Sequence, residues 1–208
     1  MLMYEAFARA EEARQARALS EIADAARPFA GGIAGRSTPG GWSNTAVGMG
    51  LNGPVTQEEV DAIVAWYEEA GIEPRFEVCP FADASLLVAL EMHRCVPLVF
   101  ENTFFRTLAK GDRVAPLVQP PPGLRVERVD PTDAAAVRRY SAVSMSGFYP
   151  EGTTPGEEDF AISARVVQHP RTIAFLATID GEPAGAGAGA VSEPLDAACG
   201  AQLGSATA

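Results

Sequence analysis

The sequence predicts an α/β (α+β) protein in which a mixed, mostly antiparallel sheet is flanked by helices. Helix-like and strand-like segments alternate along all 208 residues, and the last part ends in strands joined by tight turns. A content of 47% hydrophobic and 21% charged residues is typical of a chain that buries a core. Three consecutive prolines lie in a stiff linker at 109–124, so we expect one part at 1–108 and another at 125–208.

The first part opens with a predicted helix at 4–26, because Ala, Glu and Arg dominate this stretch and Pro28 follows it. Residues 29–51 are predicted to form two strands joined by the turn-rich sequence STPGG. Thr56 and Glu59 then form a capping box at the start of a second helix. The apolar residues that follow at helical spacing are Val60, Ile63, Val64 and Tyr67.

Two strands and one more helix complete the first part. A short strand is expected at 71–80, and Asp83 is the predicted N-cap of the next helix. The residues expected to bury that helix are Leu86, Leu87 and Leu90. Residues 97–108 are predicted to form a strand, because aromatic and β-branched residues are frequent there.

The second part restarts with a strand at 124–130. Asp130 is the predicted N-cap of a helix that has Pro131 at its first position and ends near Gly147. Another helix is expected at about 157–168. The strands that follow are joined at Asp180-Gly181, a strong hairpin signal, and a closing strand begins near Cys199.

Charge and composition exclude several classes of function. The chain has 27 acidic and 16 basic residues and a net charge of -11, which disfavours nucleic acid and attracts a basic amine. Cys79, Cys95 and Cys199 form no metal-binding pair, so we expect no metal site. No stretch approaches the ~20 apolar residues of a membrane span, and the start lacks a secretory signal, so a cytoplasmic setting is expected.

The sequence GMGLNG has the spacing of a dinucleotide fingerprint at Gly48, Gly50 and Gly53. That chemistry needs the pyrophosphate on free amides at a helix start. Pro54 has no N–H, and Thr56 starts the helix only after the third glycine and occupies amides that a phosphate needs. We therefore favour a glycine-rich turn and keep nucleotide binding as the weaker alternative.

Residues 125–208, ordered strand, helix, helix and a three-stranded meander with DGEPAGAGAGAV at its hairpin, resemble the opening half of a GNAT-superfamily N-acetyltransferase. The stretch from GGWSNTAVGMGLNG to EPRFEVCP, together with PLVFENTFFRTL, is similar to the degenerate N-terminal half of a two-part GNAT protein. The resemblance extends from about Pro28 and implies acetyl-CoA as co-substrate and transfer of an acetyl group to an amine. In this family a pyrophosphate loop follows the fourth strand, so we expect a chain truncated before that loop, with impaired activity.

The resemblance also implies where ligands would lie. The fourth strand would offer main-chain groups to the pantetheine arm, here Ala206, Thr207 and Ala208. The loop GFYPEGTTPGEED would form a wall of the acceptor site, with Tyr149, Glu157 and Glu158 as candidate substrate-binding residues. Acidic residues at a helix start more often compensate the helix dipole than hold a cationic substrate. No catalytic residue is assigned.

Three functions therefore stay open. The first is an acetyl-CoA-dependent N-acetyltransferase. The second is a non-catalytic homologue, fragment or interaction module, whose uncharged C-terminal strand would form a homodimer by strand pairing. The third is a nucleotide-binding protein built on Gly48, Gly50 and Gly53.

Overall fold

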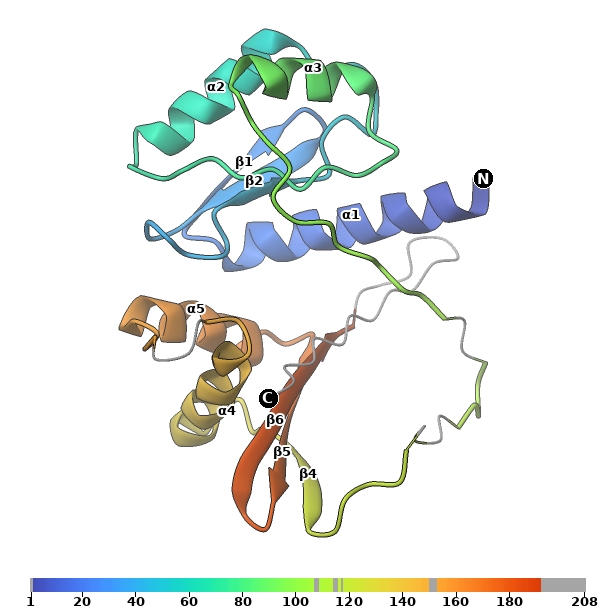
Figure 1. Ribbon diagram of the computed structural model, residues 1–208, viewed down its shortest axis with the longest axis vertical. Helices are drawn as coiled ribbons and strands as arrows, with labels where there is room; N and C mark the ends of the chain where they lie inside the picture. Colours follow the sequence, from blue (N-terminus) through green and yellow to red (C-terminus); the bar gives the residue numbers. More distant parts are fainter. Residues whose placement is uncertain (1, 107–108, 114–115, 117, 150–152, 192–208) are drawn as a thin grey trace. The chain divides into compact units, whose positions relative to one another are not determined.

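The computed structural model describes residues 2–106, 109–113, 116, 118–149 and 153–191 (Figure 1). These residues form two compact units, divided between Phe100 and Glu101. Each unit holds a three-stranded antiparallel sheet accompanied by helices, which confirms the predicted α/β class. The predicted closing strand from Cys199 lies outside the described residues.

The first unit is a sheet between helices. In chain order its elements are α1 (Leu2–Ile22), β1 (Ala25–Phe29), β2 (Gly32–Arg36), β3 (Thr45–Val47), α2 (Gln57–Glu68) and α3 (Ala84–Met92). The strands lie in the order β1-β2-β3, with α1 on one face and α2 and α3 on the other (Figure 1). Leu19 and Ile22 of α1 are buried. The principal core contains Phe29, Ala34, Met49, Val60, Ile63, Tyr67, Leu86 and Leu90.

A hairpin that the sequence did not indicate forms the first two strands. β1 and β2 pair from Ala25–Arg36 to Phe29–Gly32, through a turn in which Ala30 has φ 46°. A Cβ at Gly32 would lie 2.0 Å from the carbonyl oxygen of Val47, so only glycine lets β2 approach β3 this closely. The helix predicted at 4–26 is thus wrong at its end: it stops at Ile22, because the residues from Ala25 onward pair in the sheet.

The two helix starts predicted in this unit are confirmed. Thr56 Oγ1 accepts from the Glu59 amide at 3.2 Å, and Glu59 Oε2 accepts from the Thr56 amide at 2.9 Å, which completes the capping box. The predicted apolar face of α2 is buried. Asp83 caps α3 by accepting from the Ser85 amide at 3.0 Å. Leu87, which we expected to be buried, is exposed, whereas its neighbours on α3 at Leu86 and Leu90 are buried.

Two predicted strands of the first part are not strands over the described residues. In place of the strand at 71–80 there is one isolated parallel bridge between Ala46 and Phe76. Residues 97–106 have no regular secondary structure. Strand propensity reflects how a side chain fits a pleated, partly buried surface, and no described strand pairs with 97–106.

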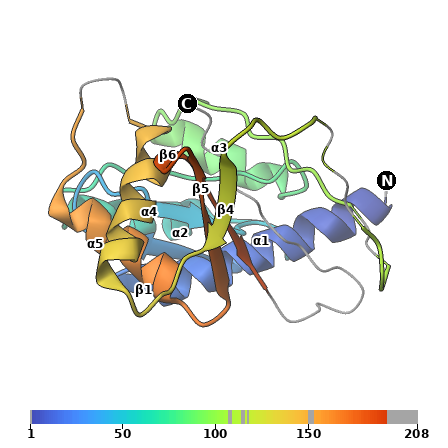
Figure 2. The ribbon, with the colours of Figure 1, turned by 90° about the horizontal axis from the view of Figure 1, so that it is seen from below.

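The second unit is a sheet with helices on one face. Its elements are β4 (Leu124–Arg128), α4 (Ala134–Ser146), α5 (Glu157–Gln168), β5 (Thr172–Ile179) and β6 (Glu182–Ala190), and the strands lie in the order β4-β5-β6. Figures 1 and 2 show α4 and α5 side by side on the sheet. The core residues are Val129, Val137, Tyr140, Val167, Ala174 and Ala186. The predicted bounds of α5 are confirmed, and so is the turn at Asp180-Gly181, where both residues have positive φ.

The cap of α4 differs from the prediction. The N-cap is Asp133, whose carboxylate accepts from the amides of Ala135 and Ala136 at 2.9 and 3.2 Å. Asp130 instead accepts from the Thr132 amide at 2.9 Å and forms a turn. The reason lies one residue earlier, where Val129 still donates to Ala174 in the sheet at 2.9 Å, so the chain must turn before a helix can begin.

Candidate functional site

The start of α5 brings three acidic residues together. Gly156 is the N-cap and has no side chain to offer, so Asp159 reaches back and accepts from the Gly156 amide at 2.8 Å. Glu157, Glu158 and Asp159 fill the first turn, where negative charge is favoured by the helix dipole. Dipole compensation alone accounts for acidic residues here, so a binding role needs a further group.

Tyr149 is that further group. It follows α4 and is half-buried, and its side chain is hydrogen-bonded to Asp159. Burial, followed by this hydrogen bond and the negative charges of Asp159 and Glu158, raises the pKa of Tyr149 from 10 to about 12. The phenol therefore keeps its proton at neutral pH and can donate a hydrogen bond, but it cannot act as a phenolate base.

Glu157 belongs to a different interaction. Its carboxylate forms a bidentate pair with Arg138 of α4, at 2.7 and 2.9 Å, and the same guanidinium lies 4.1 Å from the ring centroid of Phe160. The hydrogen bond from Arg138 lowers the pKa of Glu157. Of the three residues predicted to bind the acceptor, Tyr149 thus lies near Glu158, whereas Glu157 is paired with Arg138. The contact of Tyr149 with Asp159 had no signal in the sequence beyond the shared loop.

The predicted pantetheine-binding residues Ala206, Thr207 and Ala208 lie outside the described residues. The proposed strand-pairing surface at the C-terminal end lies outside them as well.

The glycine loop at 48–53 is held by the protein itself. The Gly48 amide donates to Glu12 Oε2 at 2.8 Å, and the Gly50 amide donates to the Ala30 carbonyl at 3.0 Å. All three glycines have positive φ, as a tight turn requires. Glu12 also interacts with Cys79, and burial raises the pKa of the Glu12 carboxyl. Two of the amides that a dinucleotide would use are therefore occupied, and a carboxylate stands where a phosphate would bind.

The diphosphate of acetyl-CoA needs free amide donors, which are commonly found at a helix start. The starts of α2, α3 and α4 are capped by Thr56, Asp83 and Asp133, and the start of α5 by the carboxylate of Asp159. The described starts of α2 to α5 thus present side-chain acceptors or negative charge and do not fit a diphosphate. No step through the cofactor can be assigned to them.

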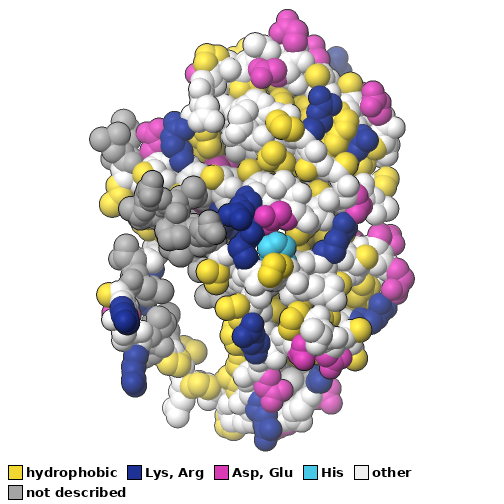
Figure 3. Space-filling model, turned by 180° about the vertical axis from the view of Figure 1, so that it is seen from behind, with side chains coloured by type: hydrophobic (Ala, Val, Ile, Leu, Met, Phe, Trp, Pro, Cys, Tyr) yellow, Lys and Arg dark blue, Asp and Glu magenta, His cyan; other side chains and the backbone are white. Residues whose placement is uncertain are grey.

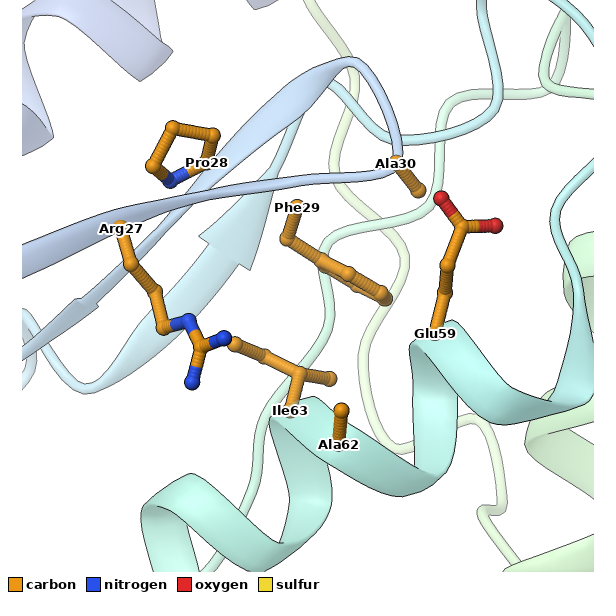
Figure 4. A pocket seen from close by; sticks show the side chains of 7 residues that line it. All are labelled: Arg27, Pro28, Phe29, Ala30, Glu59, Ala62 and Ile63. Carbon is orange, nitrogen blue, oxygen red and sulfur yellow. The ribbon is translucent and has the colours of Figure 1, made fainter.

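A small hollow lies between β1 and α2 in the first unit (Figure 4). Its volume is about 130 Å³, well below the ~300–1,000 Å³ of a typical ligand pocket. Arg27 and Glu59 line it together with Phe29 and Ile63, and Glu59 is already engaged in the capping box. The hollow is therefore too small for a cofactor of the size of acetyl-CoA.

The described residues also lack two other kinds of functional feature. Where the structure describes the chain, no three His, Cys, Asp or Glu side chains gather closely enough to hold a metal ion. No helix in the described ranges is long and apolar enough to cross a membrane. Acidic and basic side chains are interspersed over the face shown in Figure 3.

Comparison with known proteins shows similarity of fold. No protein-family model matches the sequence, and no curated protein matches it significantly. A GCN5-related N-acetyltransferase from Kribbella flavida is similar over 86% of this chain and 66% of its own, with a TM-score of 0.52 and 15% identity. An aminoglycoside acetyltransferase, meta-AAC0020, from an uncultured soil metagenomic sample, solved in complex with trehalose, is similar over 41% of this chain and 56% of its own, with a TM-score of 0.32 and 16% identity. This chain thus spans less than two thirds of either structure.

Proposed function

We propose that this chain acts in the transfer of an acetyl group from acetyl-CoA to an amine, as a protein of the GNAT superfamily. The observation that carries the proposal is the likeness of fold to a GCN5-related N-acetyltransferase over 86% of the chain, at a TM-score of 0.52. The order β4-α4-α5-β5-β6 in the second unit agrees with it, since the resemblance implies strand, helix, helix and a strand meander there.

The acceptor would be bound at the start of α5. A protonated amine is attracted by Glu158 and Asp159, while Glu157 is neutralised by Arg138. Tyr149, which keeps its proton and is hydrogen-bonded to Asp159, would line the acceptor site beside that carboxylate. Ala206, Thr207 and Ala208 stay our proposed main-chain partners of the pantetheine arm.

Binding and transfer are measured separately on the full chain. Acetyl-CoA is titrated by calorimetry and by thermal unfolding, where a specific ligand raises the melting temperature with the logarithm of its concentration. Release of free CoA is then followed with a thiol reagent across diamines, amino sugars and peptide amines. NAD serves as the comparison ligand, and we expect no binding because Glu12 and Ala30 occupy the Gly48 and Gly50 amides. Absence of acetyl-CoA binding at millimolar concentration would refute the proposal, and binding without transfer would favour the non-catalytic homologue.

A matched set of variants tests the acceptor site. In the double variant Glu158→Gln, Asp159→Asn we expect the KM for the amine to rise roughly tenfold with little change in kcat, since a charge that binds acceptor and transition state equally affects KM alone. Glu157→Gln is the control, because its carboxylate is paired with Arg138. If Glu157→Gln raised the KM for the amine equally, the effect would come from the overall negative charge and not from a binding site at Glu158 and Asp159.

A further inference from the structure

The hollow between β1 and α2 has opposite charges at its two ends (Figure 4). The guanidinium of Arg27 lies toward one end and the carboxylate of Glu59 toward the other, and the ring of Phe29 lies between them. Phe29 is 5% exposed and Ile63, which also lines the hollow, is 1% exposed, so the apolar floor is already packed. A mostly apolar recess with a few placed polar groups is the usual form of a small-molecule site.

Arg27 supplies the positive end. Within the described residues Arg27 enters no ion pair, and its guanidinium lies 5.8 Å from the ring centroid of Trp66. The guanidinium of Arg36, on the neighbouring strand β2, lies 4.3 Å from the same centroid. Two guanidinium groups beside one ring concentrate positive charge locally, in a chain whose net charge is -11. A carboxylate is therefore favoured at this end, where a planar guanidinium can bind both of its oxygens.

Glu59 supplies the negative end. Its side chain is exposed, and Oε2 accepts from the Thr56 amide at 2.9 Å in the capping box. A carboxylate has lone pairs for several hydrogen bonds, so this one contact leaves Glu59 able to accept more. An ammonium group has three donors and no acceptor, and it is the complementary partner at this end.

The spacing of the two ends determines the shape of the ligand. Arg27 is two residues from Phe29 on β1, about 7 Å along the strand. Glu59 is one turn from Ile63 on α2, about 6 Å along the helix axis. The apolar floor thus separates the two charges, so a matching ligand has its own charges at opposite ends of an apolar chain. An α-amino acid does not meet this condition, because one carbon carries both its ammonium and its carboxylate.

We propose that this hollow binds a short ω-amino acid as a zwitterion, with its carboxylate on Arg27 and its ammonium on Glu59. The methylene chain of the ligand covers Phe29 and Ile63 and is thereby removed from water. The volume of about 130 Å³ suits a ligand of this size and is too small for a nucleotide. The hollow lies wholly within the first unit, and the proposal is independent of acetyl transfer.

Titration of the full chain with γ-aminobutyrate and δ-aminovalerate tests the proposal. Trp66 fluorescence reports on the positive end, because the Arg27 guanidinium lies over that ring, and calorimetry gives an independent measurement. We expect a dissociation constant on the order of 1 mM for a ligand of this size. Butyrate and n-butylamine each lack one of the two charges and should bind at least about tenfold more weakly. L-valine, an α-amino acid, should also bind more weakly than the ω-amino acids.

Two variants remove one charge each from the ends of the hollow. Glu59→Gln retains the capping box, since Gln serves at this position as well as Glu. It should weaken binding of γ-aminobutyrate at least about tenfold and leave that of butyrate unchanged. Arg27→Gln should weaken γ-aminobutyrate equally and leave n-butylamine unchanged. The matched controls are Glu58→Gln and Arg75→Gln, at exposed positions of the first unit outside the hollow.

Three results would each overturn the proposal. The first is no saturable binding of either ω-amino acid at concentrations about tenfold above the expected dissociation constant. The second is binding of butyrate, n-butylamine or L-valine as tight as that of the ω-amino acids. The third is a loss of γ-aminobutyrate affinity in Glu58→Gln and Arg75→Gln equal to that in Glu59→Gln and Arg27→Gln, since binding would then depend on overall charge and not on this hollow.

Discussion

Replacing Tyr67 by Phe tests how the first unit is held together. Tyr67 is fully buried in the core, and its hydroxyl donates to the carbonyl oxygen of Gly35 at 3.0 Å, which ties α2 to β2. Phe keeps the ring and removes only the donor, so the buried carbonyl of Gly35 loses this hydrogen bond. An unsatisfied buried group costs about 1–3 kcal/mol. With a urea slope of about 2 kcal/mol per molar, the midpoint should fall by roughly 0.5–1.5 M.

Tryptophan fluorescence makes this measurement specific to the first unit, because Trp42 and Trp66 both belong to it. The ring of Trp66 lies 5.1 Å from that of Tyr67, so the signal originates next to the mutated side chain. Tyr140→Phe is the control, a buried tyrosine of the second unit, and it should leave this midpoint unchanged. A change of less than about 0.3 kcal/mol in Tyr67→Phe, within the additivity error of such data, would refute the assigned contribution.

Three further predictions concern the core and the titrating groups. Leu86→Ala should lower the free energy of unfolding by about 2–5 kcal/mol, because Leu86 is buried. Leu87→Ala, at an exposed position, should change it by no more than ~0.5 kcal/mol, and urea unfolding of the two variants measures both effects. Burial raises the pKa of Glu12 in the folded state above its ordinary 4.5, so the folded state binds this proton more tightly than the unfolded state does. Stability therefore falls as the pH rises from the unfolded-state pKa through the higher folded-state pKa. Glu12→Gln should remove that part of the slope, as measured by urea midpoints between acidic and neutral pH, and an unchanged slope would contradict it. Asp159→Asn should lower the pKa of Tyr149 from about 12 without restoring 10, because burial is the larger cause, and tyrosinate absorbance during alkaline titration measures it.

The elements that the sequence predicted correctly are those governed by neighbours along the chain. The capping box of Thr56 and Glu59 joins groups three residues apart, and the turn at Asp180-Gly181 needs only positive φ at adjacent positions. The acidic first turn of α5 is equally local. Such signals act within one turn of backbone, so they survive in almost any tertiary context.

The elements that the sequence did not predict depend on partners far along the chain. The end of α1 is set by the pairing of β1 with β2, and the start of α4 by the bond from Val129 to Ala174. The same holds for the glycine loop, whose Gly48 amide is bound by Glu12, thirty-six residues away.

The sequence by itself thus determined the α/β class, most of the helices and the last hairpin. Only the tertiary structure decided that the loop amides are occupied, that Tyr149 contacts Asp159 while Glu157 pairs with Arg138, and that residues 98–104 stand exposed. The physical reason is that strand pairing and buried hydrogen bonds are contacts between distant segments. Packing of the whole fold determines which segments pair, and the local propensity of a segment does not contain that information.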